Sequence, residues 1–471
     1  MKTAASDWSW PGSIKTVLYF IDPYGCVKNQ VDAETMMSVL NEAGWKAAEN
    51  PEEADLIIVN SCGFIESAKR ESIEAVLGFR KAYPQKKILL AGCLAQRYAE
   101  ELSLELTEAD FFFGNTDLSR AAEAARAALD SGRGTRENKL LPPLDETGAL
   151  DFAPYTGTRP LLSLPGSAYV KITEGCDNRC SFCAIPLIRG PLRSRRPEEI
   201  LEECRELIGR GIRELCVIGQ DLGSYGKDGA QGSWEKGSCR LPELLDILTE
   251  LEGSFWLRLL YIHPDNFPEP LLDLCRGDSR FLPYFDLPFQ HASPSLLRAM
   301  KRRGDGGSYL RLIRGIRSAL PGALIRSTFM TGFPGETDED FECLLDFQEQ
   351  ARLDWLGVFA YSREEGTPAY SLGKKVPRRL AEERKALLEE RQIPISEERM
   401  DRFVGTVSQI LIEERVENED GLYLGRLPCQ APEVDGAAVI SSDVPLQIGT
   451  FVKGRIISRS GIDLFAAALD G

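Results

Sequence analysis

The chain has 471 residues, of which 43% are hydrophobic and 27% are charged, a balance typical of a soluble globular protein. No apolar run approaches the length of a membrane span, and residues 1–13 lack the apolar core of a signal peptide, so we expect neither. The net charge of −16 favours a basic or neutral macromolecular partner over a polyanion. Twelve cysteines without a secretion signal indicate a reducing compartment, so we expect a cytoplasmic protein whose cysteines carry metal or redox chemistry.

The first 130 residues alternate between short apolar runs and amphipathic stretches. The sequence predicts strands at residues 16–21, 55–59 and 87–91, and helices at 31–43, 65–82, from 95 onward and at 121–129. Such alternation builds βαβ units, in which parallel strands share a sheet and helices cover its faces. We therefore predict a doubly wound parallel α/β domain over residues 14–130.

A cysteine follows each of the three predicted strands of this domain: Cys26, Cys62 and Cys93. In open parallel sheets, ligand sites lie outside the carboxyl ends of the strands. The three thiols are therefore expected to converge on one edge although more than thirty residues separate each from the next. Convergence predicts a three-cysteine iron–sulfur site, and the alternative is a set of buried free cysteines.

Residues 131–161 are rich in Gly, Pro, Thr and charged side chains and show little periodicity. This composition predicts a linker. We assign no cofactor ligand to it.

A predicted strand at residues 168–172 leads into a loop with three cysteines at Cx3Cx2C spacing, namely Cys176, Cys180 and Cys183. This spacing can place three thiolates on one side of a loop, which suits an iron–sulfur cluster. A cubane cluster has four irons, so three cysteines leave one iron open to another ligand. The alternatives are a structural zinc site, which usually closes with a fourth Cys or His, and three incidental buried thiols.

Further strands follow the loop, with helical patterns between most of them. They are predicted at residues 214–218, 256–262, 284–287, 324–330 and 355–361. Six βα repeats are fewer than the eight of a closed barrel. We therefore predict a partial (β/α)6 barrel within a domain over residues 162–400.

Polar residues cluster just beyond the ends of these strands, on the face where barrel enzymes keep their chemistry. They are Gln220-Asp221, His263-Pro264, Gln290-His291 and residues 331–336, which end in Glu336. Each residue has a structural alternative as a helix cap or turn residue. Lys171 and Arg326 are either solvated charges or contacts to an anionic cofactor.

The last part of the chain, residues 402–471, contains four predicted short strands separated by turns, which favours a small all-β barrel. Such barrels often bind nucleic acid. This one carries six Lys or Arg against ten Asp or Glu, a composition better suited to a basic protein surface than to phosphates.

The Cx3Cx2C loop resembles that of the radical S-adenosylmethionine enzymes, and the upstream cysteine domain and downstream barrel resemble the methylthiotransferase subgroup, over nearly the whole chain beyond residue 14. The resemblance implies two [4Fe-4S] clusters, a radical-generating one on Cys176, Cys180 and Cys183 and an auxiliary one on the upstream three cysteines. It implies S-adenosylmethionine as the ligand of the open iron. The residues expected to contact this cofactor are Phe182, Gln220, Asp221, Arg326, Gly332 and Glu336.

Several stretches are similar to the branch of this family that modifies ribosomal protein S12 rather than tRNA. They are residues 25–29, 219–226, 285–293, 326–337 and 431–436. This branch implies transfer of a methylthio group to the β-carbon of an aspartate in S12, a strongly basic protein, with an external electron donor and sulfur source. We expect a monomer with at most weak direct RNA binding. The alternatives are methylthiolation of a tRNA adenosine and a non-catalytic Fe–S RNA-binding protein.

Overall fold

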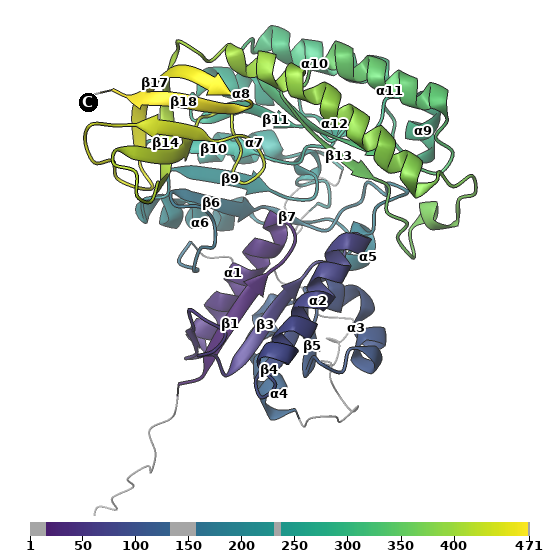
Figure 1. Cartoon of the computed structure of the whole chain (residues 1–471), viewed down its shortest axis with the longest axis vertical. Helices are drawn as coiled ribbons and strands as arrows, with labels where there is room; N and C mark the ends of the chain where they lie inside the picture. The colour runs from purple at the N-terminus through teal and green to yellow at the C-terminus, as the bar shows by residue number, and fades with distance from the viewer. Residues whose placement is uncertain (1–15, 132–156, 230–236, 470–471) are drawn as a thin grey trace, which may run out of the picture.

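The computed structural model describes residues 16–131, 157–229 and 237–469. Most of the predicted linker over residues 131–161 lies outside the described residues. Figure 1 shows the N-terminal domain in purple and blue, attached to the teal and green central domain, with the terminal barrel in yellow. Among the described residues, no helix combines the length and the apolar character that crossing a membrane requires.

The N-terminal domain is a five-stranded parallel sheet with the strand order β2-β1-β3-β4-β5. Its strands are β1 (Leu18–Pro23), β2 (Lys46–Ala47), β3 (Leu56–Ser61), β4 (Lys87–Gly92) and β5 (Phe111–Phe113). Its helices are α1 (Val27–Glu42), α2 (Glu66–Ala82), α3 (Cys93–Glu105) and α4 (Ala121–Asp130). Strand β3 is buried along its whole length, as expected for a central strand whose two faces both carry helices.

This strand order confirms the predicted doubly wound α/β fold and adds two strands that the sequence did not predict, β2 and β5. In the order 2-1-3-4-5 the strands are added to one side of β1 and then to the other, so the strand order reverses between β1 and β3, and ligands bind at such switch points in these sheets. The edge strand β2 is what creates the switch point. Its two residues are exposed and follow no hydrophobic pattern, so the sequence carried no signal for it.

The central domain contains six parallel strands in sequential order, with β6 and β13 at the two edges. They are β6 (Ser167–Lys171), β9 (Glu214–Ile218), β10 (Trp256–Leu259), β11 (Phe281–Asp286), β12 (Leu324–Thr331) and β13 (Trp355–Ala360). Its helices are α5 (Ile185–Arg189), α6 (Pro197–Gly209), α7 (Leu241–Leu248), α8 (Leu271–Gly277), α9 (Pro294–Ala299), α10 (Gly306–Ala319), α11 (Asp338–Ala351) and α12 (Arg378–Asp401). The predicted partial (β/α)6 barrel is confirmed.

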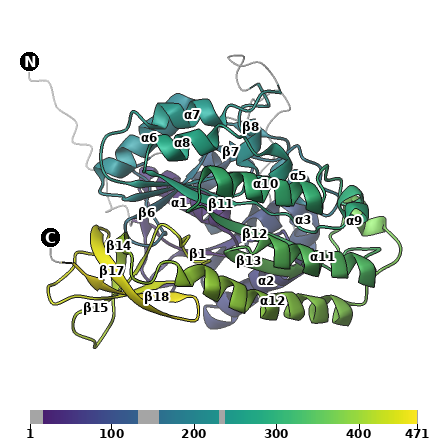
Figure 2. The ribbon, with the colours of Figure 1, turned by 90° about the horizontal axis from the view of Figure 1, so that it is seen from above.

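The two faces of the central sheet have different neighbours, because side chains alternate along each strand. Leu257, Phe285 and Ile325 pack against the surrounding helices. Trp256 and Tyr284, which point to the opposite face, belong to a second apolar core that they share with the terminal barrel. The inner face of the partial barrel is therefore covered at one end by the terminal barrel, which lies at one end of the central domain in Figure 2.

The terminal barrel is closed, with the strand order β14-β15-β16-β18-β17. Its strands are β14 (Val407–Arg415), β15 (Leu422–Arg426), β16 (Ala438–Ser441), β17 (Phe451–Ser460) and β18 (Asp463–Ala468). The strand β18 was not predicted, and it closes the barrel by pairing parallel to β16 and antiparallel to β17. A closed five-stranded barrel confirms the predicted all-β module.

Candidate active site

The three N-terminal cysteines lie at the carboxyl edge of the N-terminal sheet. Cys26 is the N-cap of α1, Cys62 directly follows β3, and Cys93 is the first residue of α3 after β4. Cys26 and Cys62 therefore flank the switch point between β1 and β3. Gly25 has a φ of 95°, and a Cβ there would lie 2.7 Å from Cys62 Cβ, so the turn that carries Cys26 approaches Cys62 closely only because this residue is glycine.

The N-terminal cysteines form one electrostatic group. Cys62 and Cys93 are buried and Cys26 is exposed, and all three are free thiols. Burial, together with the nearby Cys26, raises the pKa of Cys62 to about 11. Burial also raises the pKa of Cys93 to about 12, against the opposing effect of Arg189. Two buried thiols whose ionisation is opposed by burial, next to a third and exposed thiol, are a donor set that a positively charged iron centre would stabilise as thiolates.

A polar hub at Asn29 holds the N-terminal set together. Its Nδ2 donates to the carbonyl oxygens of Tyr24 and Ser61, each at 2.8 Å, and so ties the turn before Cys26 to the end of β3. Its Oδ1 lies 3.1 Å from Cys93 Sγ. All three loops that carry a cysteine are thus fixed around one side chain.

The Cx3Cx2C loop is closed at its base by a two-stranded antiparallel ribbon, β7 (Thr173–Glu174) with β8 (Arg193–Ser194). Gly175 sits where the loop begins, with a φ of 70°, and a Cβ there would meet the carbonyl oxygen of Pro191 at 2.0 Å. The loop is anchored further by Ser181, whose N–H and hydroxyl donate to carbonyl groups at the end of α9. The ribbon and this anchor were not predicted from the sequence.

The three cysteines of the loop are half-buried and free. Burial raises the pKa of Cys176 to about 11 and that of Cys183 to about 12, and the neighbouring Cys180 contributes to both shifts. Cys180 Sγ lies 3.9 Å from His263 Nε2. Burial, together with Arg302, lowers the pKa of His263 to about 4, so a neutral imidazole faces this sulfur.

No three His, Cys, Asp or Glu side chains in the described ranges surround a single point closely enough to hold one metal ion. A cubane cluster gives each cysteine its own iron, so its three sulfurs need not converge on one point. Each set offers three thiols as donors, which fits such a cluster better than a four-coordinate zinc ion, which needs a fourth ligand.

Asp221 is a second polar hub, beside the Cx3Cx2C loop. Its Oδ2 accepts from the side-chain amides of Asn178 and Asn266, each at 2.7 Å, and from Ser224 Oγ at 2.6 Å. Its Oδ1 accepts from the N–H of His263 at 2.9 Å. Asp221 therefore fixes the loop to the segments after β9 and β10, and its contact with a cofactor stays a prediction.

Glu336 is also engaged within the protein. Its Oε2 accepts a short hydrogen bond from the N–H of Gly332 and lies 3.2 Å from Arg384 Nη1, while its Oε1 lies 3.5 Å from His291 Nε2. Gly332 has a φ of 77°, so the loop after β12 folds back on this carboxylate. The geometry gives Glu336 a loop-holding role, and its cofactor role stays a prediction.

The remaining predicted cofactor contacts lie on the inner side of the central sheet or beside the loop. Phe182 is half-buried within the loop, with its ring centre 6.0 Å from the Arg302 guanidinium, and Gln220 lies two residues beyond the end of β9. Arg326 lies between two carboxylates, 3.5 Å from Asp286 and 3.6 Å from Asp435 of the terminal barrel. The cofactor contacts of these three residues stay predictions.

One segment after β10 contacts the Cx3Cx2C loop and also α1, close to Cys26. His263 contacts Cys180, and Tyr261, two residues earlier, lies against Lys28 with its ring centre 2.8 Å from the Nζ atom. Burial raises the pKa of Tyr261, and the charges of Asp286 and Cys26 add to this shift. The two cysteine sets therefore flank the same edge of the central sheet.

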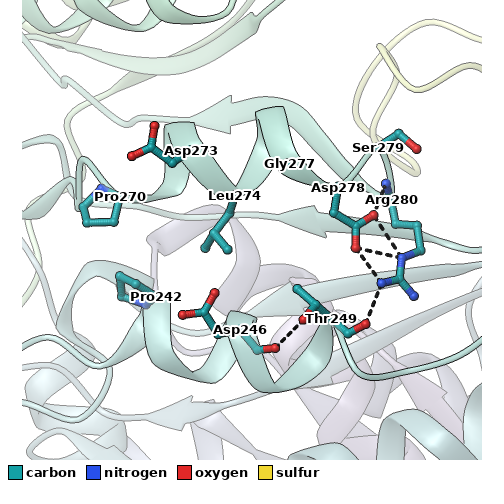
Figure 3. Close-up of a pocket in the computed structure, with 10 residues that line it drawn as sticks. All are labelled: Pro242, Asp246, Thr249, Pro270, Asp273, Leu274, Gly277, Asp278, Ser279 and Arg280. Carbon is teal, nitrogen blue, oxygen red and sulfur yellow. Dashed lines mark hydrogen bonds and ion pairs between the residues drawn. The ribbon is translucent and has the colours of Figure 1, made fainter.

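A groove of about 710 Å³ lies elsewhere, between α7 and α8 (Figure 3). Arg280 crosses its end and donates to Asp278 at 2.5 Å and to the carbonyl of Thr249 at 2.7 Å. None of its ten lining residues is a predicted site residue. We assign it no part in the activity.

Arg189, Asn29 and Lys171 belong to the site but were missed or misread from the sequence. Arg189 contacts Cys93 and was not singled out, although a lone arginine in a short apolar helix six residues after Cys183 was the available signal. Lys171 is neither solvated nor free for an anionic cofactor, because it is fully buried and paired with Asp32 and Glu174.

Family models match the three domains in turn. Residues 18–114 match the model described as Uncharacterized protein family UPF0004, residues 170–347 match the Radical SAM superfamily, and residues 404–469 match the TRAM domain. The fold is similar to that of TsrM from Kitasatospora setae, a radical S-adenosylmethionine methyltransferase, with a TM-score of 0.55, 15% identity, and coverage of 76% of this chain and 74% of that one. Fold and cysteine loop together define a radical S-adenosylmethionine protein.

Proteins with similar sequences identify the family within the radical S-adenosylmethionine proteins. The chain is 45% identical to the ribosomal protein uS12 methylthiotransferase RimO of Treponema denticola, over 95% of this chain and 100% of that one. It is 41% identical to the RimO proteins of Heliobacterium modesticaldum and Aquifex aeolicus, over 97% and 93% of this chain and 96% and 94% of theirs. This chain belongs to the RimO family of ribosomal protein uS12 methylthiotransferases.

Proposed function

We propose that this chain transfers a methylthio group to the β-carbon of an aspartate in ribosomal protein uS12. The observation that carries the proposal is that both three-cysteine sets lie against the central domain: His263 contacts Cys180 of the loop, and Arg189 contacts Cys93 of the N-terminal set. Radical initiation and sulfur delivery need two such centres within reach of one substrate carbon. The names of the relatives supply the substrate, uS12.

The Cx3Cx2C loop would hold the cluster that binds S-adenosylmethionine. When bound, this pair supplies the one-electron chemistry that an unactivated sp3 carbon requires. The residues of the chain orient it: the β7–β8 ribbon fixes the base of the loop, and Asp221 holds Asn178 and the segment after β10. Phe182, Gln220 and Arg326 are the side chains we assign to the cofactor, with Gly332 and Glu336 shaping the loop after β12.

Cys26, Cys62 and Cys93 would hold a second [4Fe-4S] cluster, whose open position would carry the sulfur to be transferred. Cys26 is the exposed member of the set and lies near Tyr261 and Lys28, while Cys62 and Cys93 are buried. Burial on one side and exposure on the other suit a centre that must be protected from solvent yet open to the reaction. The proposed reaction also requires an external electron donor and an external sulfur source.

The terminal barrel supports a protein rather than a nucleic-acid substrate. Its acidic balance, six Lys or Arg against ten Asp or Glu over residues 402–471, opposes binding to phosphates and suits a basic ribosomal protein. We assign residues 14–130 to the auxiliary cluster domain, 162–400 to the radical core and 402–471 to substrate docking. We expect the chain to act as a monomer.

The test is anaerobic reconstitution with iron and sulfide, followed by incubation with S-adenosylmethionine, a reductant and either uS12 or total tRNA. A mass gain of about 46 Da on one aspartate of uS12, the difference between a methylthio group and hydrogen, is expected. Modification of tRNA with no change in uS12 would overturn the substrate and favour the adenosine alternative. Binding of RNA with no cofactor cleavage would overturn the enzymatic assignment altogether.

A further inference from the structure

Arg189 connects the two cysteine sets through the protein. It is the last residue of α5, the short helix that follows Cys183, and so belongs to the radical core. Its Nη2 lies 3.2 Å from Cys93 Sγ, 3.0 Å from Asn29 Oδ1 and 2.9 Å from Asp32 Oδ2, all in the N-terminal domain. A cation of one domain thus donates to a sulfur of the other.

A closed ring of four buried charges fixes the guanidinium. Arg189 pairs with Asp32 at 2.9 Å and with Glu174 at 2.8 Å, and Lys171 pairs with the same two carboxylates, at 2.6 Å to Glu174 and by a short contact to Asp32. None of the four is more than 5% exposed. Two cations and two anions balance, so the ring holds Arg189 in place with no net charge of its own.

Two N–H groups donate to the sulfur of Cys93. Besides Arg189, the side-chain amide of Asn115 donates to it at 3.3 Å. As a free thiol, Cys93 donates its own proton to Asn29 Oδ1. A thiolate that binds iron has no such proton, which leaves Arg189 and Asn115 as its hydrogen-bond partners within the described part of the chain. Cys93 also belongs to a small buried apolar cluster with Ala184 and Ile188 of the central domain.

Hydrogen bonds to ligating sulfurs, local charge and burial set the reduction potential of an iron–sulfur cluster. A charged N–H donor stabilises negative charge on a buried sulfur more strongly than a neutral one. The reduced cluster carries one more electron than the oxidised cluster, so a cation at this distance favours the reduced form.

We propose that Arg189 is a positioning residue that couples domain docking to the auxiliary centre, by donating to Cys93 Sγ across the junction and raising the reduction potential of that centre. The inference rests on the second cluster of the proposed function. It goes beyond that function because it makes the electron affinity of the auxiliary centre depend on a residue of the radical core.

Another buried arginine of the same junction provides the matched control. Arg159 is fully buried and bonds Glu34 of α1, Glu203 of α6 and the carbonyl of Tyr169. Its described partners are oxygens. A purely structural role for junction arginines predicts that Arg159→Gln and Arg189→Gln behave alike.

The experiment uses the full chain carrying Cys176→Ala, Cys180→Ala and Cys183→Ala, so that only the auxiliary cluster is assembled. A redox titration followed by electron paramagnetic resonance compares this background with added Arg189→Gln, Arg189→Lys or Arg159→Gln. We expect Arg189→Gln to lower the ratio of reduced to oxidised cluster about tenfold at a fixed applied potential. For a one-electron couple this corresponds to a reduction potential about 59 mV more negative. Arg189→Lys keeps the charge and should recover part of the shift, and Arg159→Gln should leave the potential unchanged.

Asn115→Leu gives a second measurement that leaves the charge ring intact. Removing this neutral donor should move the potential in the same direction by less. If the background, Arg189→Gln and Asn115→Leu all bind iron and have equal reduction potentials, the inference about Arg189 is overturned, while the assignment of the second cluster is unaffected. A background chain that binds no iron would overturn the second cluster, and the inference with it.

Discussion

The central domain meets its two neighbours in different ways. The junction with the terminal barrel is mainly an extension of a hydrophobic core, in which Trp256 packs against Phe451 with ring centres 4.6 Å apart and Trp355 donates to the carbonyl of Cys429. It also contains the buried ion pair of Arg426 with Glu214. At the junction with the N-terminal domain, α1 packs against β6, and the contact is built from buried ion pairs of Asp32 with Lys171 and of Arg159 with Glu34.

The two junctions therefore contribute differently: the junction with the barrel mainly adds stability, and the junction with the N-terminal domain mainly fixes geometry. Apolar packing is non-directional and contributes stability in proportion to the area buried. Buried ion pairs add little net stability, because desolvation offsets their attraction, but they fix geometry wherever partners must match one to one. The terminal barrel therefore completes the fold of the core, whereas the N-terminal junction sets the position of Cys93 relative to the Cx3Cx2C loop.

The largest expected effect tests how separable the two cysteine sets are. Replacing Cys176, Cys180 and Cys183 with Ala should abolish cleavage of S-adenosylmethionine while about half of the bound iron remains, since the other set is carried by a domain with its own core. Replacing the three N-terminal cysteines should leave cleavage intact and abolish methylthio transfer. Iron analysis and product chromatography measure both, and continued cleavage by the first variant would refute the radical assignment.

The next effect concerns the apolar junction. Trp355→Ala should lower the free energy of unfolding by about 4 kcal/mol, because it leaves a cavity in the shared core and removes the bond to Cys429. Trp355→Phe keeps most of the packing and should cost less than half as much. Denaturant unfolding of the full chain measures both, and equal losses for the two variants would contradict the packing argument.

A smaller loss is expected at the charged junction. Asp32→Asn should destabilise the chain by about 3 kcal/mol, because Lys171 and Arg189 would share Glu174 as the one remaining carboxylate of the ring. Hydrogen exchange should show the loss in α1 and β6 while β14 keeps its protection. Glu42→Gln, an exposed change on the same helix, is the control, and a similar small effect of both variants would mean that the ring does not hold the junction.

The smallest effect depends on pH and belongs to the apolar junction. Burial raises the pKa of Asp435 from 3.8 to about 6, so the folded chain holds this proton more tightly than the unfolded chain does. The resulting stability is full below pH 3.8 and is lost as the pH rises through 6, by roughly 1 kcal/mol per pH unit.

Asp435→Asn should remove this dependence. The oxygen of the new amide can still accept from Tyr284 and from the N–H of Ala431, which both donate to Oδ2 in the parent chain. Unfolding free energies of both chains at pH 5 and pH 7.5 would then diverge in favour of the variant. If the difference in unfolding free energy between the two chains were the same at both pH values, Asp435 would not be the group responsible for the pH dependence.

The Cx3Cx2C loop needed little beyond the sequence, because its three cysteines lie within eight residues and their spacing is local. The N-terminal set needed one general rule, that parallel strands end at the same edge. The rule brings Cys26, Cys62 and Cys93 together without any knowledge of side-chain contacts.

Contacts between residues distant in sequence were beyond such rules. Asp221 and Glu336 were predicted to face the cofactor from their place beyond strand ends, but the structure shows their oxygens bonded to protein donors. Strand β2 is too short and too exposed to produce a pattern, yet it creates the switch point between β1 and β3.

The sequence by itself determined the three-domain order, the two cysteine sets and, through resemblance, the chemistry. Those features depend on local periodicity, on spacing and on the direction of parallel strands. The tertiary structure alone decided how the sets are joined: Arg189 reaches a sulfur 96 positions earlier in the chain. Which buried charges become partners depends on how the domains dock, because a charge pairs with whatever opposite charge packing brings within reach.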